Sequence, residues 1–479
     1  MTDTRPDIVM MMTDQHAARI LGAAGDRHAD TPALDRLATQ GTRFENCYCP
    51  APLCVPSRMA FLTGLEPQTT GVLTNDNYLP SDIPTIAHAM GAAGYDCHLV
   101  GRMHFYGPDQ LHGFAARPIG DIGASFPGGA PPGIGPLTPG RGNRGPELAH
   151  SGAGETSYQA YDLAVADHAE RTLTALKNRR KRTGRPFFAL VSLFCPHPPY
   201  IARAEDYARF SGTLPPPRLP PPETDHPAIA AWRRAGKVDD LTDEAIARSR
   251  AGYYGLVRMI DRICGRVLKC IEGQENTVTI YTSDHGECLG ERGLWWKSVF
   301  YDESAKVPLI VRGPGIAPDA VDRRVVSLMD LSATLLDLAG AAPLPGQTGR
   351  SLMNATDWQD RCTASYYGGL MNIAVSDVRH RMLRRGDLKL TIHDGAPPQL
   401  FDLGADPDEL HDLAGDPEWR DRLDDLIAEA TEDWDAAGIA EMQKRQAGRV
   451  AVIRDWVRRT APPEPMRWRD PQPGRNRYE

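Results

Sequence analysis

A cysteine followed by a proline and an arginine is the clearest chemical feature of this chain. The segment reads CVPSRMAFLTG from Cys54 to Gly64. Pro56 suits the first turn of a helix, so Cys54 is expected just before a helix N-terminus, where free backbone N–H groups favour an anion. Arg58, one turn further on, would add a fixed positive charge. The pattern therefore predicts a nucleophile presented at an anion site.

The same segment is the maturation signature of the type I sulfatases, and the chain resembles that family within the alkaline phosphatase superfamily. In these enzymes the Cys of C-x-P-x-R is oxidised to formylglycine by a dedicated formylglycine-generating enzyme. The resemblance implies that Cys54 is modified, that the hydrated aldehyde is the nucleophile, and that the reaction is hydrolysis of sulfuric esters. A lone Cys is commonly a small buried hydrophobe, and only the complete motif reverses that interpretation for Cys54.

Polar side chains also follow four short apolar runs that are bounded by turn residues. Such runs between helical patterns predict an α/β fold with a large, mostly parallel sheet flanked by helices. In open α/β sheets ligands bind outside the carboxyl ends of the strands, so these side chains are expected on one rim. The runs and the polar groups after them are Ile8–Met12 with Asp14, Cys97–Val100 with Arg102 and His104, Phe187–Phe194 with His197, and Thr277–Thr282 with Asp284 and His285.

Two of these strand ends carry the oxygen ligands that a hard divalent cation prefers. Asp14, Asp284 and the oxygen of a modified Cys54 would provide such ligands, and Gln15 and His285 are candidates to complete the set. The resemblance implies one divalent cation, with Ca²⁺ expected ahead of Mn²⁺ or Mg²⁺. Many family members carry two adjacent Asp near the N-terminus, whereas Asp14 is followed here by Gln15, so one ligand charge is lost.

Four further groups match positions that bind sulfate or move protons in the family. Lys297, at the end of GERGLWWK, matches the lysine that holds sulfate and assists the leaving group, and His197 matches the histidine of a P-H-x-P motif. Without the resemblance, each would be interpreted as an ordinary surface lysine or turn histidine. Arg102 replaces the usual lysine and should bind the oxyanion without relaying a proton, because guanidinium does not titrate. His104 is then the better candidate for the base.

The length of 479 residues is compatible with one large α/β domain that carries a smaller C-terminal one. After about residue 345 the pattern changes to short alternating segments, which predict a small antiparallel sheet in an α+β unit. We therefore expect a catalytic domain over 1–345 and a C-terminal subdomain with a tail over 346–479. Apolar positions among charged ones predict an amphipathic helix over 156–182.

Residues 115–155 are dominated by Gly and Pro and are expected to form a substrate-side loop. The block GRMHFYGPDQLHGF over 101–114 resembles choline-sulfatase-like enzymes. A trimethylammonium group is held by an aromatic cage, yet Phe126 is the only aromatic residue in the loop. Arg141 and Arg144 lie there instead and are the candidate substrate-binding residues. Either the cage comes from elsewhere or the substrate is not choline sulfate.

The overall composition excludes several classes of protein. The net charge of −8, with acidic and basic residues intermixed, argues against nucleic-acid binding and against a polybasic membrane patch. No apolar stretch reaches the length of a membrane span, and the N-terminus lacks the features of a signal peptide. Nine cysteines without paired zinc-type spacing indicate mostly reduced thiols. We therefore expect a cytoplasmic homo-oligomer that acts on a small-molecule sulfate ester.

Two other functions stay open at this point. Related formylglycine enzymes hydrolyse phosphonate monoesters or phosphodiesters with nearly the same pocket. From a different class, the chain could be a non-catalytic anion-binding module that never receives its aldehyde. A two-zinc phosphatase is disfavoured because the sequence shows no second set of Asp and His ligands.

Overall fold

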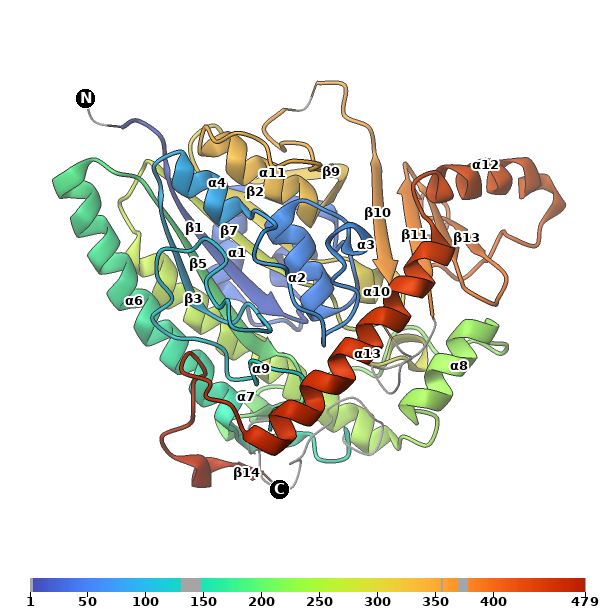
Figure 1. The fold of residues 1–479 in the computed structure, drawn as a ribbon. Helices are drawn as coiled ribbons and strands as arrows, with labels where there is room; N and C mark the ends of the chain where they lie inside the picture. Colours follow the sequence, from blue (N-terminus) through green and yellow to red (C-terminus); the bar gives the residue numbers. More distant parts are fainter. Residues whose placement is uncertain (1–2, 131–147, 355, 369–377, 479) are drawn as a thin grey trace.

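A seven-stranded sheet forms the centre of the computed structural model, which describes residues 3–130, 148–354, 356–368 and 378–478 (Figure 1). The strand order is β3-β5-β1-β7-β8-β2-β9. Strands β3, β5, β1 and β7 are parallel neighbours, β8 is antiparallel to both β7 and β2, and β2 is parallel to β9. The bounds are β1 (Asp7–Asp14), β2 (Thr42–Tyr48), β3 (Asp96–Gly101), β5 (Phe187–Pro196), β7 (Thr277–Ser283), β8 (Leu309–Arg312) and β9 (Ala320–Ser327).

Helices cover both faces of this sheet, so its strands are apolar on both sides. Val9 and Met11 of β1 pack on one side with α1 (Pro32–Thr39), α6 (Ser157–Thr183) and α9 (Asp243–Cys270). Ile8 and Met10 pack on the other side with α2 (Cys54–Thr63), α4 (Ile86–Ala92) and α11 (Leu328–Leu338). The predicted α/β architecture is confirmed, and α6 is the amphipathic helix expected over 156–182.

A second, antiparallel sheet follows in the C-terminal part, on the right in Figure 1. Its strands are β10 (Arg361–Tyr366), β11 (His380–Arg385), β12 (Leu388–Ile392) and β13 (Gln399–Asp402). One face packs on α12 (Arg420–Thr431) through leucines of both elements, and the other packs on the main body through Tyr48, Val325 and Met382. The expected smaller α+β unit is therefore present, while its boundary at residue 345 stays a prediction.

The end of the chain returns across the main body. Helix α13 (Ala436–Thr460), red in Figure 1, runs diagonally over the molecule. The tail then contacts the Gly- and Pro-rich stretch, where the backbone N–H of Trp468 donates to the carbonyl of Asp121. Strand β14 (Arg477–Tyr478) pairs with β4 (Gly152–Glu155), which also pairs with β6 (Ile201–Ala202). The described residues also form α3 (Pro67–Thr70), α7 (Ala204–Ala208), α8 (Pro227–Gly236) and α10 (Asp302–Ala305).

Two general properties follow from the described residues. None of their helices combines the length and the apolar character needed to cross a bilayer. All nine cysteines lie in the described part of the chain, and none of them forms a disulfide there. The cytoplasmic location and the homo-oligomeric state stay predictions.

Candidate active site

The predicted polar groups at four strand ends lie on one rim of the central sheet. Strands β3, β5, β1 and β7 are consecutive parallel neighbours, so their carboxyl ends share an edge. Arg102 follows β3 and donates from Nε to Asp14 Oδ2 of β1 at 2.7 Å. Asp284 follows β7 and accepts from the backbone N–H of Gln15 at 3.0 Å. The topology thus brings residues from distant parts of the chain into direct contact.

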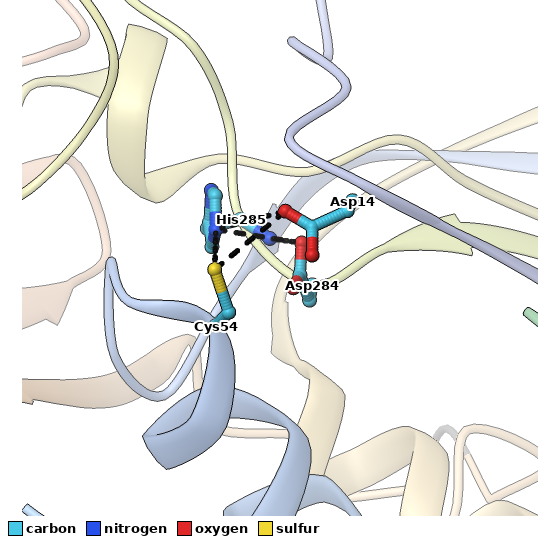
Figure 2. A group of neighbouring side chains, drawn as sticks. All are labelled: Asp14, Cys54, Asp284 and His285. Carbon is cyan, nitrogen blue, oxygen red and sulfur yellow. Dashed lines mark hydrogen bonds and ion pairs between the residues drawn. The ribbon is translucent and has the colours of Figure 1, made fainter. Parts of the chain in front are cut away.

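Cys54 enters this rim from a different element. It is the first residue of α2 and is 1% exposed. Its Sγ lies 3.2 Å from His285 Nε2 and 3.6 Å from Asp14 Oδ1 (Figure 2). It also lies 3.1 Å from Lys297 Nζ. Strand β2 leads into α2 and runs in the same direction as β7, because β8 lies antiparallel between them. The expected placement at a helix N-terminus is therefore found, with Cys54 inside the first turn.

Asp14, Cys54, Asp284 and His285 form a compact buried group that fits a metal ion. One ligand atom from each lies within 4.8 Å of all the others (Figure 2). His285 Nδ1 lies 3.0 Å from the carbonyl oxygen of Gly286, so Nδ1 carries the ring proton and donates a hydrogen bond to that oxygen. The lone pair of its Nε2 therefore faces the Oδ1 atoms of both aspartates, each 3.6 Å away. A cation among these acceptors would offset their mutual repulsion.

Two arginines hold the aspartates from the other side. Arg58 donates from Nε to Asp284 Oδ2 at 2.8 Å and from Nη2 to Asp14 Oδ2 at 3.2 Å. Burial would raise the pKa of Asp14, but the charges of Arg102, His197 and Arg58 hold it well below its usual range. Asp14 therefore stays ionised. In both aspartates Oδ2 is bonded to arginine, and Oδ1 lies on the side of His285 Nε2, where the candidate cation position is.

Gln15 lies beside this group, and its amide is used elsewhere. Its Oε1 accepts from Lys297 Nζ at 2.7 Å, and its Nε2 donates to Glu287. Lys297 is thereby held between Gln15 and Cys54, and it is 2% exposed. Because Lys297 is buried, it is not an ordinary surface lysine. The amide of Gln15 holds its ammonium group in place.

His197 and His104 complete the predicted residues that the structure describes. Burial, followed by the charge of Lys297, lowers the pKa of His197, while the neighbouring Asp14 and Cys54 oppose that shift. His104 contacts Arg102 through Nδ1 at 2.9 Å, and the structure shows no hydrogen bond between His104 and Cys54 among the described residues. Arg141 and Arg144, the candidate substrate-binding residues, lie outside the described residues.

Two buried carboxylates belong to the site and had no predicted role. Glu287 accepts from Gln15, the Tyr200 hydroxyl and two backbone N–H groups, and burial raises its pKa. Asp121 accepts from Arg102 Nη1 at 3.0 Å and from the backbone N–H of His104 at 2.8 Å. Glu287 stands close to the Asp284 motif and could have been suspected, whereas Asp121 lies in a Gly- and Pro-rich stretch without any periodic signal.

Comparisons with known proteins agree with this geometry. Residues 6–341 match the sulfatase family, and residues 290–433 match the C-terminal part of N-sulphoglucosamine sulphohydrolase. The choline-sulfatase of Rhizobium meliloti (strain 1021) is 34% identical over 95% of this chain and 91% of its own length. The arylsulfatase of Clostridium perfringens (strain 13 / Type A) is 28% identical over 88% of this chain and 93% of its own.

Solved structures share the fold. The phosphonate monoester hydrolase of Agrobacterium radiobacter superposes with a TM-score of 0.73 at 23% sequence identity, covering 89% of this chain and 94% of that one. At this identity the likeness concerns the fold alone. The family match spans well over half of the chain, and the identity to a choline-sulfatase exceeds 30% over nearly all of it. This protein therefore belongs to the sulfatase family and is a hydrolytic enzyme of that family.

Proposed function

We propose that this sulfatase hydrolyses a small organic sulfate monoester with a formylglycine formed from Cys54 as the nucleophile. The observation that carries the proposal is the convergence of Lys297, His285 and Asp14 on one buried sulfur at the start of a helix. The formylglycine-generating enzyme would be a transient partner, acting before residue 54 is buried.

A divalent cation, with Ca²⁺ expected first, would bind to Asp14, Asp284, His285 and the oxygen of residue 54. When bound, it would polarise that oxygen and an oxygen of the sulfate group. Arg58 and Arg102 orient the two carboxylates by bonding their Oδ2 atoms. Gln15 supports the site through Lys297.

The positive side chains would bind and stabilise the anionic ester. Lys297 lies 3.1 Å from Cys54 Sγ and cannot swing away, because Gln15 holds its Nζ. A fixed charge in a buried site stabilises the negative charge that develops on the sulfuryl oxygens without reorganisation. His197 or Lys297 would supply the proton to the departing alcohol.

Two hydroxyls on one carbon distinguish a hydrated formylglycine from cysteine or serine. One hydroxyl would lose its proton and attack sulfur, which breaks the S–O bond to the alcohol, and the alcohol leaves with a proton from His197 or Lys297. The second hydroxyl would then give up its proton to water and re-form the aldehyde as the C–O bond to the sulfate breaks. A serine at position 54 has a single hydroxyl, so Cys54→Ser would stop at a stable sulfate ester. This difference separates a formylglycine enzyme from one that uses an unmodified side chain.

Peptide mass spectrometry and a substrate panel test the proposal together. The peptide that contains residue 54 should show loss of sulfur and gain of oxygen, and the modified fraction should scale with turnover of sulfate esters. Cys288, which is equally buried and lies outside the metal-binding group, provides an internal control that keeps its sulfur. Full activity with an unmodified thiol at Cys54 would overturn the proposal.

A second candidate is hydrolysis of phosphonate monoesters or phosphodiesters. It is favoured by the fold shared with the phosphonate monoester hydrolase of Agrobacterium radiobacter. The panel should therefore contain choline sulfate, aryl sulfates, phosphonate monoesters and phosphodiesters at equal concentration. A kcat/KM that is higher for a phosphonate or phosphodiester than for every sulfate would favour this candidate. An unmodified, inactive protein that still binds sulfate would indicate a non-catalytic anion-binding module.

A further inference from the structure

Arg102 is fixed by all three of its nitrogens. Nε donates to Asp14 Oδ2 at 2.7 Å, Nη1 donates to Asp121 Oδ1 at 3.0 Å, and Nη2 lies 2.9 Å from His104 Nδ1. The guanidinium carbon lies 4.7 Å from the centre of the Phe194 ring, so one face of the group is also covered. The orientation of the Nη2–H group toward His104 is therefore set by the protein.

This contact determines the protonation pattern of the imidazole. A guanidinium has five N–H donors and no acceptor, so the contact is a hydrogen bond only if His104 Nδ1 accepts. A neutral imidazole whose Nδ1 accepts carries its proton on Nε2. A charged imidazolium would direct the Nδ1–H group at the cation of Arg102. Burial, followed by that charge, lowers the pKa of His104 well below its usual range.

Asp121 holds both partners of this hydrogen bond. Its Oδ1 accepts from Arg102 Nη1, and its Oδ2 accepts from the backbone N–H of His104 at 2.8 Å. The backbone of His104 is left-handed, with a φ of 61°, a conformation that non-glycine residues rarely adopt. The tail supports Asp121 in turn, since the N–H of Trp468 donates to its carbonyl at 2.8 Å. One carboxylate thus sets the distance between residue 104 and the guanidinium.

We propose that Asp121 and Arg102 lock His104 in the neutral tautomer that is protonated on Nε2, so that His104 serves the reaction as a hydrogen-bond donor. Among the described residues none forms a hydrogen bond with this Nε2, so its N–H is available to an oxygen of the bound ester. The role differs from that of a base, which would need a free lone pair on Nε2. It rests on the proposed sulfatase site, while the tautomer itself belongs to the resting protein.

The tautomer can be measured without turnover. Full-length protein labelled with ¹⁵N in its histidines should give, for His104, a protonated Nε2 and an unprotonated Nδ1 in two-bond ¹⁵N–¹H correlation spectra. The signals are assigned by their loss in His104→Gln. The reverse tautomer, or a charged ring at neutral pH, would overturn the proposal. This readout does not depend on the modification of Cys54, so failure of the proposed function would leave it intact.

Two variants test the lock itself. Arg102→Met removes the donor and should let His104 populate both tautomers, and Asp121→Asn should produce a partial version of the same change. Arg117 is a matched control, because it is buried and lies 4.0 Å from Asp121 but makes no contact with His104 in the described structure. Arg117→Met should keep the single tautomer. An unchanged tautomer in folded Arg102→Met would exclude the lock.

Kinetics of three variants at position 104 separate a donor from a base. Glutamine supplies an N–H donor and no base, glutamate supplies a base and no donor, and alanine supplies neither. Removing one such donor typically costs about 10²–10³-fold in kcat, so His104→Ala should lose about that much. His104→Gln should recover part of the loss at every pH, whereas His104→Glu should recover none. A His104→Glu enzyme faster than His104→Gln would overturn the donor role.

Discussion

Two clusters of charged side chains are buried in this molecule, and they differ in how their charges are paired. The reaction cluster consists of Asp14, Cys54, Asp284 and His285, with Arg58, Arg102 and Lys297 around it. The interface cluster lies where the C-terminal sheet meets the main body and consists of Tyr48, Asp302, Arg384, Lys389 and Glu409.

In the interface cluster the chain supplies every counter-charge. Lys389 Nζ lies 2.7 Å from Asp302 Oδ1 and 2.8 Å from Glu409 Oε1. Tyr48, Lys306 and the backbone N–H of residue 302 also donate hydrogen bonds to these carboxylates. In the reaction cluster, by contrast, the Oδ1 atoms of two aspartates and the lone pair of His285 face one another. The interface cluster therefore has cationic and N–H partners from the chain itself, whereas the reaction cluster has facing acceptors that the proposed metal ion would bring together.

The sharpest way to test this contrast is to remove the reactive atom. Cys54→Ala should lower kcat by at least about 10³-fold, because the proposed nucleophile is lost while the rest of the site remains. The melting temperature should change little, since a small side chain replaces a small one. Measurement of kcat at saturating sulfate ester and of thermal unfolding checks both parts. Cys288→Ala is the control, and equal kcat values for the two variants would contradict the assignment.

Removal of one facing carboxylate tests whether the reaction cluster is completed by a metal. Asp284→Asn should reduce bound metal and lower kcat more than about 100-fold, since a direct ligand should matter more than the outer residues that orient ligands. Elemental analysis after gel filtration, together with kcat, provides the measurement. The control is Asp330→Asn, which changes a buried carboxylate that caps α11 and should leave the metal content unchanged. Full metal content in an active Asp284→Asn enzyme would show that the ion binds elsewhere.

Breaking the interface cluster should affect stability and spare the chemistry. Lys389→Met leaves Asp302 and Glu409 buried without their shared cation, and such a change costs about 3–5 kcal/mol. Denaturant unfolding measures the loss, and kcat per folded molecule should stay near the wild-type value. The pair of Arg385 with Glu429, in which Arg385 is exposed, is the comparison, because Arg385→Met should cost below about 1 kcal/mol. Equal losses for both variants would contradict the description of the interface.

The smallest effect concerns acid stability of the C-terminal sheet. Burial and the neighbouring His226 lower the pKa of His393 to about 4, and burial with His393, His226 and Arg379 lowers that of His380 to about 3. In the unfolded chain His380 and His393 take up protons below about pH 6.5, whereas in the folded chain they stay neutral to a lower pH. The free energy of unfolding that these neutral histidines contribute is therefore fully present above about pH 6.5, and it is lost as the pH falls toward their folded-state pKa values.

The variant His393→Gln should remove part of this acid sensitivity. Near pH 5 the wild-type protein should lose about 1–2 kcal/mol more than the variant relative to neutral pH. Urea unfolding of both proteins across that range gives the comparison. Parallel stability curves would show that His393 does not contribute, and would leave the carboxylates to account for acid unfolding.

The reaction cluster could be predicted from sequence because its residues stand next to clear local patterns. Asp14 and Asp284 end apolar runs, and Cys54 lies in a motif that also predicts its helix. Because the carboxyl ends of parallel strands share one edge of the sheet, these residues could be placed together without knowing which strands pair. The antiparallel β8 was not part of that prediction, and it was not needed to place the rim.

Asp121, which supports the reaction cluster, and Lys389 of the interface cluster could not be predicted in the same way. Asp121 bonds to residues 17 and 19 positions away through a loop that has no periodic pattern. Lys389 lies between two leucines in an alternating strand, a pattern that indicates a solvent-facing lysine. In the structure it is 1% exposed, because the second face of that sheet packs on the main body. Pairing over such distances depends on tertiary packing that local pattern does not encode.

The position of β2 has a consequence for the order of events during synthesis. This strand leads into Cys54, and it pairs with β8 and with β9 as far as Ser327. At roughly 5–20 residues per second, the intervening stretch of about 270 residues takes about 14–55 s to leave the ribosome. Until then the sheet around residue 54 cannot close, and afterwards Cys54 is 1% exposed. The proposed modification of Cys54 would therefore have a limited time window in the nascent chain, set by the sequence distance between β2 and its partner strands.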